Sequence, residues 1–76
     1  MAFIDCHFHS NVLGRACSML AIVPQRTLNQ IGLDSVGSGR KNYPVLYLLH
    51  GLSDDHTIWM RRTSIERYAA QYELVI

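Results

Sequence analysis

The segment from Leu46 to Asp55 contains the residues best suited to chemistry. An apolar run, Leu46-Tyr47-Leu48-Leu49, passes directly into His50-Gly51-Leu52-Ser53. Glycine permits turns that other residues resist, and it leaves neighbouring backbone amides accessible. Fixed N–H donors about 2.7–3.1 Å from a developing oxyanion are what acyl transfer requires. The segment therefore predicts a turn that stabilises negative charge during acyl transfer.

The chain offers no nucleophile to work with this turn. A nucleophile elbow has the pattern Gly-x-Ser-x-Gly between a strand and a helix, and its acid and base follow it in the chain. No serine fits this pattern, and Ser38 comes nearest, between Gly37 and Gly39 in a polar stretch. Because an oxyanion donor alone gives little turnover, we expect this chain to be inactive by itself.

His7 and His9 suggest a second kind of chemistry. Alternation along a strand places both imidazoles on one face, where they could share a zinc ion as in the opening strand of metal-dependent amidohydrolases. Such a site needs more ligands, and only His50 and His56 remain as histidines. Neither follows the strand–helix rhythm of a barrel. Solvated histidines are therefore the preferred interpretation, and no metal or organic cofactor is expected.

Strand patterns account for most of the first fifty residues. Phe3–His9 alternates in the manner of a half-buried edge strand. Ala16–Val23 predicts a second strand that pairs with the first and ends before Pro24. Gln25–Asn42 is predicted to be a polar loop. The run from Tyr43 to Leu49 is apolar on both faces, which is typical of strands covered on two sides in a parallel sheet.

A helix and a further strand are predicted after the turn. Thr63 and Glu66 fit a capping box, with Thr63 as the N-cap. One buried stripe is expected at helical spacing, formed by Ile65, Tyr68, Ala69 and Tyr72. A fourth strand begins at Leu74, so that strand, helix and strand form a parallel crossover unit. The acidic pair Asp54-Asp55 and His56 are expected to shape the loop before the helix.

Residues 43–76 resemble the tributyrin-esterase branch of the α/β-hydrolases, close to S-formylglutathione hydrolase and the esterase D group. The matching residues are Pro44 to Ser53, Trp59, Arg62-Thr63, Glu66-Arg67 and Leu74-Val75-Ile76. The stretch from His9 to Gly14 also resembles that branch. The resemblance implies that residues 1–76 are the N-terminal segment of a single α/β-hydrolase domain, with an antiparallel strand pair followed by strand, helix and the start of a strand.

The resemblance also implies roles for individual residues. The backbone N–H of Leu52 is the oxyanion donor of the loop after the third strand, and Gly51 allows the approach. Ser53 and Trp59 lie on the substrate side. Trp59 covers the loop or lines the acyl pocket, or else it only packs at the helix entry. His50 is not the catalytic base and fixes the turn by hydrogen bonding. The implied reaction is hydrolysis of short acyl esters or acyl thioesters by a serine esterase.

Composition and net charge limit the kinds of partner and the cellular location that we expect. About half of the 76 residues are apolar, and the net charge is +1. No basic field is available for nucleic acid, and no signal peptide or membrane-spanning run is predicted, so a cytoplasmic location is expected. A homo-oligomer is compatible with the sequence. The apolar ending Leu74-Val75-Ile76 predicts a piece of a longer polypeptide, with the remainder of the enzyme as a companion. A non-catalytic interaction module is the third possibility.

Overall fold

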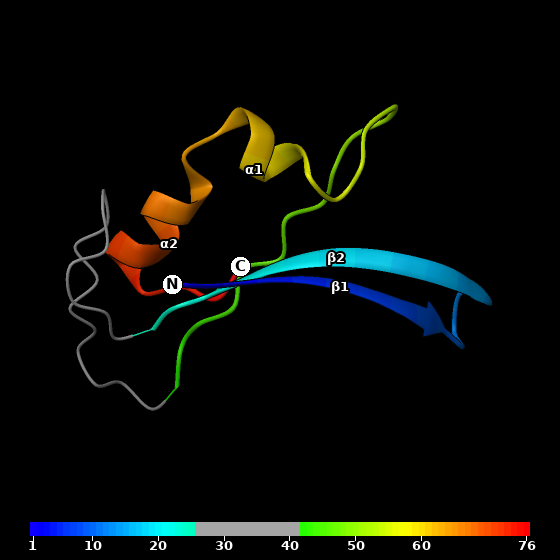
Figure 1. The fold of residues 1–76 in the computed structure, drawn as a ribbon, viewed down its shortest axis with the longest axis horizontal. Coiled ribbons are helices and arrows are strands. Elements are labelled where there is room, and N and C mark those ends of the chain that lie inside the picture. The colour runs from blue at the N-terminus through cyan, green and yellow to red at the C-terminus, as the bar shows by residue number, and fades with distance from the viewer. Residues whose placement is uncertain (26–41) are drawn as a thin grey trace.

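A computed structural model describes residues 1–25 and 42–76 of the chain. Its elements are two strands, β1 (Ala2–Ser10) and β2 (Arg15–Val23), and two helices, α1 (Ile58–Arg62) and α2 (Ile65–Tyr72). Figure 1 shows the strands as a long hairpin, with both helices on one side of it. The predicted loop Gln25–Asn42 lies almost wholly outside the described residues. In the part that is described, no helix is long and apolar enough to cross a membrane.

The hairpin confirms the first two predicted strands; β1 extends one residue further at each end, and β2 begins one residue earlier than expected. β1 and β2 are antiparallel and pair without interruption from Ala2 opposite Val23 to Ser10 opposite Arg15. The turn between them closes by a hydrogen bond of 2.8 Å from the Gly14 N–H to the Ser10 carbonyl. Gly14 has a φ of 65°, a conformation that glycine adopts without steric cost. Glycine at this position therefore allows the tight connection between the two strands.

The two faces of the hairpin have different surroundings. Phe3 pairs with Ile22, so the face that carries Phe3, Asp5 and His7 is the one that meets the core. The opposite face carries apolar side chains that remain 48% exposed at Ile4 and 44% exposed at Phe8. Within residues 1–25 and 42–76, the face that carries Asp5 and His7 is thus the one on which Ile22 enters the core, and both faces retain half-exposed apolar side chains.

The predicted third and fourth strands occur only as single pairings among the described residues. Val45 and Val75 form a parallel bridge, and Ile76 exchanges two backbone hydrogen bonds, of 2.8 and 3.0 Å, with Ile22. Residues 75 and 76 therefore join β2 to residue 45, with the parallel sense predicted for the strand–helix–strand unit. A strand requires a run of such bonds. The segment Leu74–Ile76 is too short to form a run of hydrogen bonds with the residues around Val45. Consistent with this, Tyr47 and Leu49 are 86% and 85% exposed rather than covered on both sides.

The helices differ from the prediction in two respects. Helix α1 was not predicted, and Thr63 ends it, donating its hydroxyl and its N–H to the Trp59 carbonyl. The capping box is wrong, because Ser64 occupies the N-cap of α2 without a side-chain capping bond. The stripe is correct for Ile65 and Ala69 but wrong for its two tyrosines, which are exposed.

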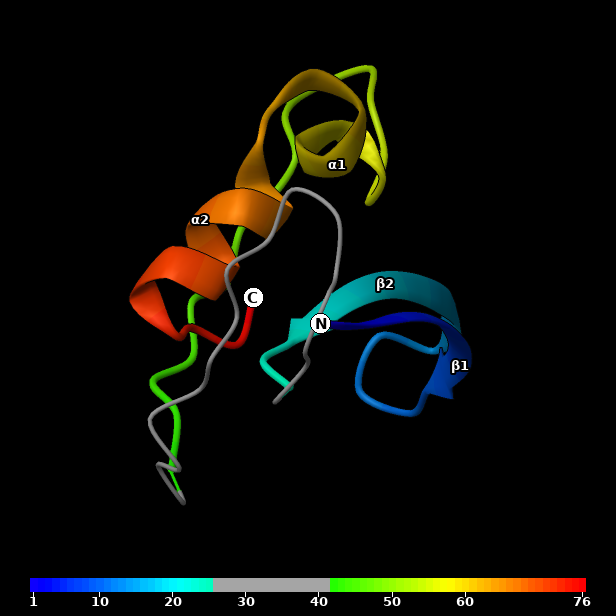
Figure 2. The same ribbon diagram turned by 60° about the vertical axis from the view of Figure 1, so that its left-hand side comes forward.

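The hydrophobic core is small and lies between β2 and α2. It consists of Met1, Ile22 and Ala69, with Met60, Ile65, Ala70 and Ile76 packed around it. Figure 2 shows α2 and the C-terminal residues on the same side of the hairpin, next to the C-terminal end of β2. Because α2 rests on this core and α1 precedes it directly, the helices and the turn before them are held over the polar face of the hairpin.

Candidate functional site

The turn at residues 50–53 is open to solvent. The Leu52 side chain is fully exposed, and Ser53 adopts a left-handed φ of 68°. Gly51 is outside the left-handed region, and a Cβ built on it would contact nothing within 4 Å. The positive φ of the turn therefore falls on Ser53, which is an uncommon conformation for a residue with a Cβ. The space beside Gly51 leaves room for another group to approach this backbone.

His50 fixes the orientation of the peptide group between Gly51 and Leu52. Its Nδ1 lies 2.8 Å from the Gly51 carbonyl oxygen, and because that oxygen can only accept, Nδ1 donates. In a planar trans peptide the C=O and N–H point in opposite directions, so the same bond aims the Leu52 N–H away from His50. This N–H makes no hydrogen bond within the described residues. The turn thus presents a fixed and available donor.

Trp59 connects α1 to the segment that leads into the turn. Its indole Nε1 donates to the Leu49 carbonyl at 3.2 Å, although ten residues separate the two in the chain. The ring remains 38% exposed, so one side of it is accessible from solvent. Trp59 therefore fastens the approach to the turn and leaves part of its aromatic surface beside it.

Polar side chains organise the loop between the turn and α1. The Asp55 carboxylate accepts hydrogen bonds from the Thr57 N–H and hydroxyl, and the Thr57 hydroxyl accepts one of 2.8 Å from Arg61 Nε. The Arg61 guanidinium also pairs with Asp54. The Thr57 side chain, followed by its backbone N–H, lowers the pKa of Asp55 below its usual value of 3.8. These contacts support the predicted loop-shaping role of Asp54 and Asp55.

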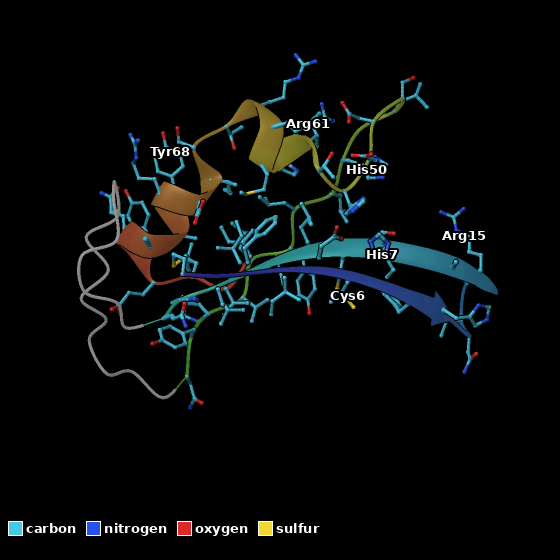
Figure 3. All side chains as sticks on the ribbon, in the orientation of Figure 1. Cys6, His7, Arg15, His50, Arg61 and Tyr68 are labelled. Carbon is cyan, nitrogen blue, oxygen red and sulfur yellow. The ribbon has the colours of Figure 1, made fainter. Side chains whose placement is uncertain are left out.

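A contact that the sequence did not predict joins this loop to the hairpin. Oδ1 of Asp5 lies 3.3 Å from His7 Nε2 and 3.5 Å from His56 Nε2. The two imidazole rings meet edge to face, with centroids 6.1 Å apart. Figure 3 shows His7 on the side of the hairpin that faces the helices, with Cys6 on the other side. Residues 5 and 56 are far apart in sequence and form no motif, so no local signal could reveal this contact.

The metal-site alternative finds no support in this arrangement. Among the described residues, no group of three or more histidine, cysteine, aspartate or glutamate side chains could hold a metal ion. His7 instead hydrogen bonds through Nδ1 to Ser18 Oγ at 2.7 Å. Ser18, His7 and Asp5 have the composition of a catalytic triad, but the His7 side chain is 67% exposed on a hairpin. Water screens such a group, so it lacks the preorganised surroundings of a nucleophilic site.

Comparison with known proteins places this chain beside solved serine hydrolases. No protein-family model and no curated protein matches the chain. Two solved structures from Staphylococcus aureus match it at 38% identity over 97% of its length. One is the substrate-bound fluorophosphonate-binding serine hydrolase FphF, with a TM-score of 0.70, and the other is the apoenzyme of the S-formylglutathione hydrolase FrmB, with a TM-score of 0.71.

This chain spans 28% of the length of each of these two proteins. Their similarity covers both the hairpin and the turn-bearing half, because almost the whole chain is aligned. The recognition made from the sequence is confirmed, and the chain is an esterase-like N-terminal part related to bacterial serine hydrolases.

Proposed function

We propose that this chain is the oxyanion-hole-bearing part of a serine carboxylesterase that hydrolyses short-chain acyl esters or acyl thioesters. One observation carries the proposal. The Leu52 N–H has no partner among the described residues, and the 2.8 Å bond from His50 to the Gly51 carbonyl holds its peptide group in one orientation. A preorganised donor of this kind stabilises the charge that develops on the carbonyl oxygen during acyl transfer.

The proposed mechanism assigns this chain to charge stabilisation alone. A serine outside these 76 residues attacks the acyl carbon, and the negative oxygen that forms accepts hydrogen bonds from the Leu52 N–H and from the residue after the nucleophile. The alcohol or thiol then leaves, and water hydrolyses the acyl-enzyme. Ser53 and the exposed surface of Trp59 border the turn and are proposed to contact the acyl group. No cofactor takes part.

The activities of the two similar proteins support this class of chemistry. One protein binds fluorophosphonates, which are reagents for serine nucleophiles, and the other hydrolyses S-formylglutathione, an acyl thioester. We propose a small acyl group on a small alcohol or thiol for the present enzyme, acting in the cytoplasm. The nucleophile, the acid and the base are proposed to lie on the remaining part of the domain, as the same or a companion polypeptide.

A pair of substitutions at Leu52 tests the donor in the complete enzyme. Leu52→Pro removes the N–H and is expected to lower kcat by about 10²–10³-fold. Leu52→Ala retains the N–H and truncates a side chain that is fully exposed, so near-normal kcat is expected. Circular dichroism controls for folding of both variants. Near-normal kcat in a folded Leu52→Pro enzyme would contradict the assignment.

Denaturing mass spectrometry after treatment with a fluorophosphonate probe tests the serine mechanism. A single probe adduct on a polypeptide other than residues 1–76, or on a longer chain that contains them, is expected. An unlabelled sample that consists of this chain alone would favour the interaction-module hypothesis. An adduct within residues 1–76 would contradict the proposal, because none of these serines lies in an elbow.

A further inference from the structure

We propose that Asp5 on the hairpin is a positioning residue for the oxyanion turn and that it acts through His56. The inference rests on the proposed function, because the element that it positions is the Leu52 donor. It concerns a part of the molecule that contains none of the predicted site residues. The hairpin would then contribute directly to catalysis by holding the loop that follows the turn.

The surroundings of His56 leave one of its ring nitrogens buried and without a partner among the described residues. Its side chain is only 23% exposed, and Nε2 is fully buried without a hydrogen-bond partner in the part of the chain that the structure describes. A buried polar atom without a partner is costly. The nearest complementary group is the Asp5 carboxylate, 3.5 Å away. The two atoms lie within ion-pair distance of each other without forming a hydrogen bond, and Asp5 is the carboxylate that faces this buried nitrogen.

Asp5 is itself held in place on the hairpin. The same Oδ1 lies 3.3 Å from His7 Nε2, and the other ring nitrogen of His7 is hydrogen bonded to Ser18 on β2. Ser18 lies directly opposite His7 in the strand register. A line of contacts therefore runs from β2 through His7 and Asp5 to His56. Asp5 therefore lies close to two imidazoles, one on the hairpin and one in the loop.

The loop transmits the position of His56 to the turn. Asp54 and Thr57 are both tied to Arg61 of α1, and Asp55 is tied to Thr57, so residues 54–61 form one connected unit. Leu52 is separated from this unit only by Ser53, whose left-handed backbone leaves few alternative conformations. A shift of the unit relative to the hairpin therefore moves the Leu52 N–H. Oxyanion donors lose effect when they are displaced by even about 1 Å.

The test uses single and double variants of the complete enzyme. Asp5→Asn and His56→Gln are each expected to lower kcat by about threefold to tenfold with unchanged KM, because the donor acts on the transition state and the pair is partly exposed. The double variant is expected to have the same kcat as the less active of the two single variants, because both substitutions break the same contact. Asp5→Glu retains the charge and is expected to restore most of kcat. His9→Gln, on the same face of β1, serves as the matched control and is expected to have no effect.

Hydrogen–deuterium exchange provides a readout that does not depend on activity. Faster exchange at the Asp55 and Thr57 amides, which donate the hydrogen bonds that hold the loop, is expected in both single variants, with unchanged exchange in the β1–β2 ladder. Additive kcat losses, a change in KM alone, an equal loss in His9→Gln, or unchanged exchange at the Asp55 and Thr57 amides would each overturn the inference. A protein without esterase activity and without probe labelling would contradict the proposed function. If its Asp5 and His56 variants still showed faster exchange in the loop, the contact between Asp5 and His56 would nevertheless be supported.

Discussion

The hairpin and the segment from residue 50 to residue 63 are stabilised by different kinds of bond. In the hairpin, nine consecutive residue pairs connect the two backbones, and side chains contribute little to its local shape. In the 50–63 segment, the structure depends on side chains that bond to specific backbone or side-chain atoms, such as Trp59 to Leu49 and Asp55 to Thr57. Substitutions should therefore be tolerated along most of the hairpin and act strongly in the turn-bearing segment.

Ile22 is the hairpin position at which truncation is expected to cost much stability. It is 3% exposed in the core next to α2, so Ile22→Ala is expected to lower the free energy of unfolding by about 2–5 kcal/mol. Chemical denaturation of the complete enzyme measures this effect. Ile4→Ala on the opposite face, with a half-exposed side chain, is the control and should cost less than about 1 kcal/mol. Equal costs would break the comparison, because they would show that the outer face is also covered.

A smaller effect is expected in the turn-bearing segment at Trp59. Trp59→Phe retains an aromatic ring and removes the hydrogen bond to the Leu49 carbonyl, which should cost about 0.5–1.5 kcal/mol. Tyr72→Phe also removes one polar group, from an exposed side chain on α2. If that control destabilised the protein as much as Trp59→Phe, the proposed fastening of the turn would be wrong.

The smallest expected effect concerns the pKa of Asp55. Thr57→Val removes the hydroxyl that is the main cause of the lowered pKa, so the pKa should rise toward 3.8, while the backbone N–H keeps part of the shift. A carboxylate with a lowered pKa in the folded state adds stability above pH 3.8 and loses it as the pH falls through the folded-state pKa. NMR titration of the Asp55 carboxyl group measures the change in its pKa. Thr63→Val, at the other end of α1, should leave the titration of Asp55 unchanged.

Periodic patterns predicted the regular parts of the fold. Alternation placed β1 and β2 within one residue of their observed ends, and the parallel pairing of residue 45 with residue 75 follows from the predicted crossover unit. The short helix α1 was missed because five residues are too few to show a helical period. The capping box failed because the Thr63 hydroxyl bonds backward to Trp59, a competing contact that a sequence motif cannot exclude.

The site was only partly predictable for a related reason. His50, Gly51 and Leu52 are consecutive, so one motif pointed to the turn, and the role of His50 in fixing it agrees with the bond to Gly51. The contact between Asp5 and His56 depends on how the hairpin lies against the loop, which is tertiary information. Ser53 was expected on the substrate side. Its left-handed backbone conformation could not be predicted from the sequence, because serine rarely adopts it.

The pairing of residues 75 and 76 has a consequence for the order of folding during synthesis. The hairpin uses only local contacts, so it can form within microseconds of leaving the ribosome, by about the general rate for such elements. Its attachment to residue 45 must wait, because Val75 and Ile76 provide the connecting bonds and are translated after every partner that they join. Until these two residues are made, β2 and residue 45 therefore have no backbone connection, and this part of the sheet is completed last.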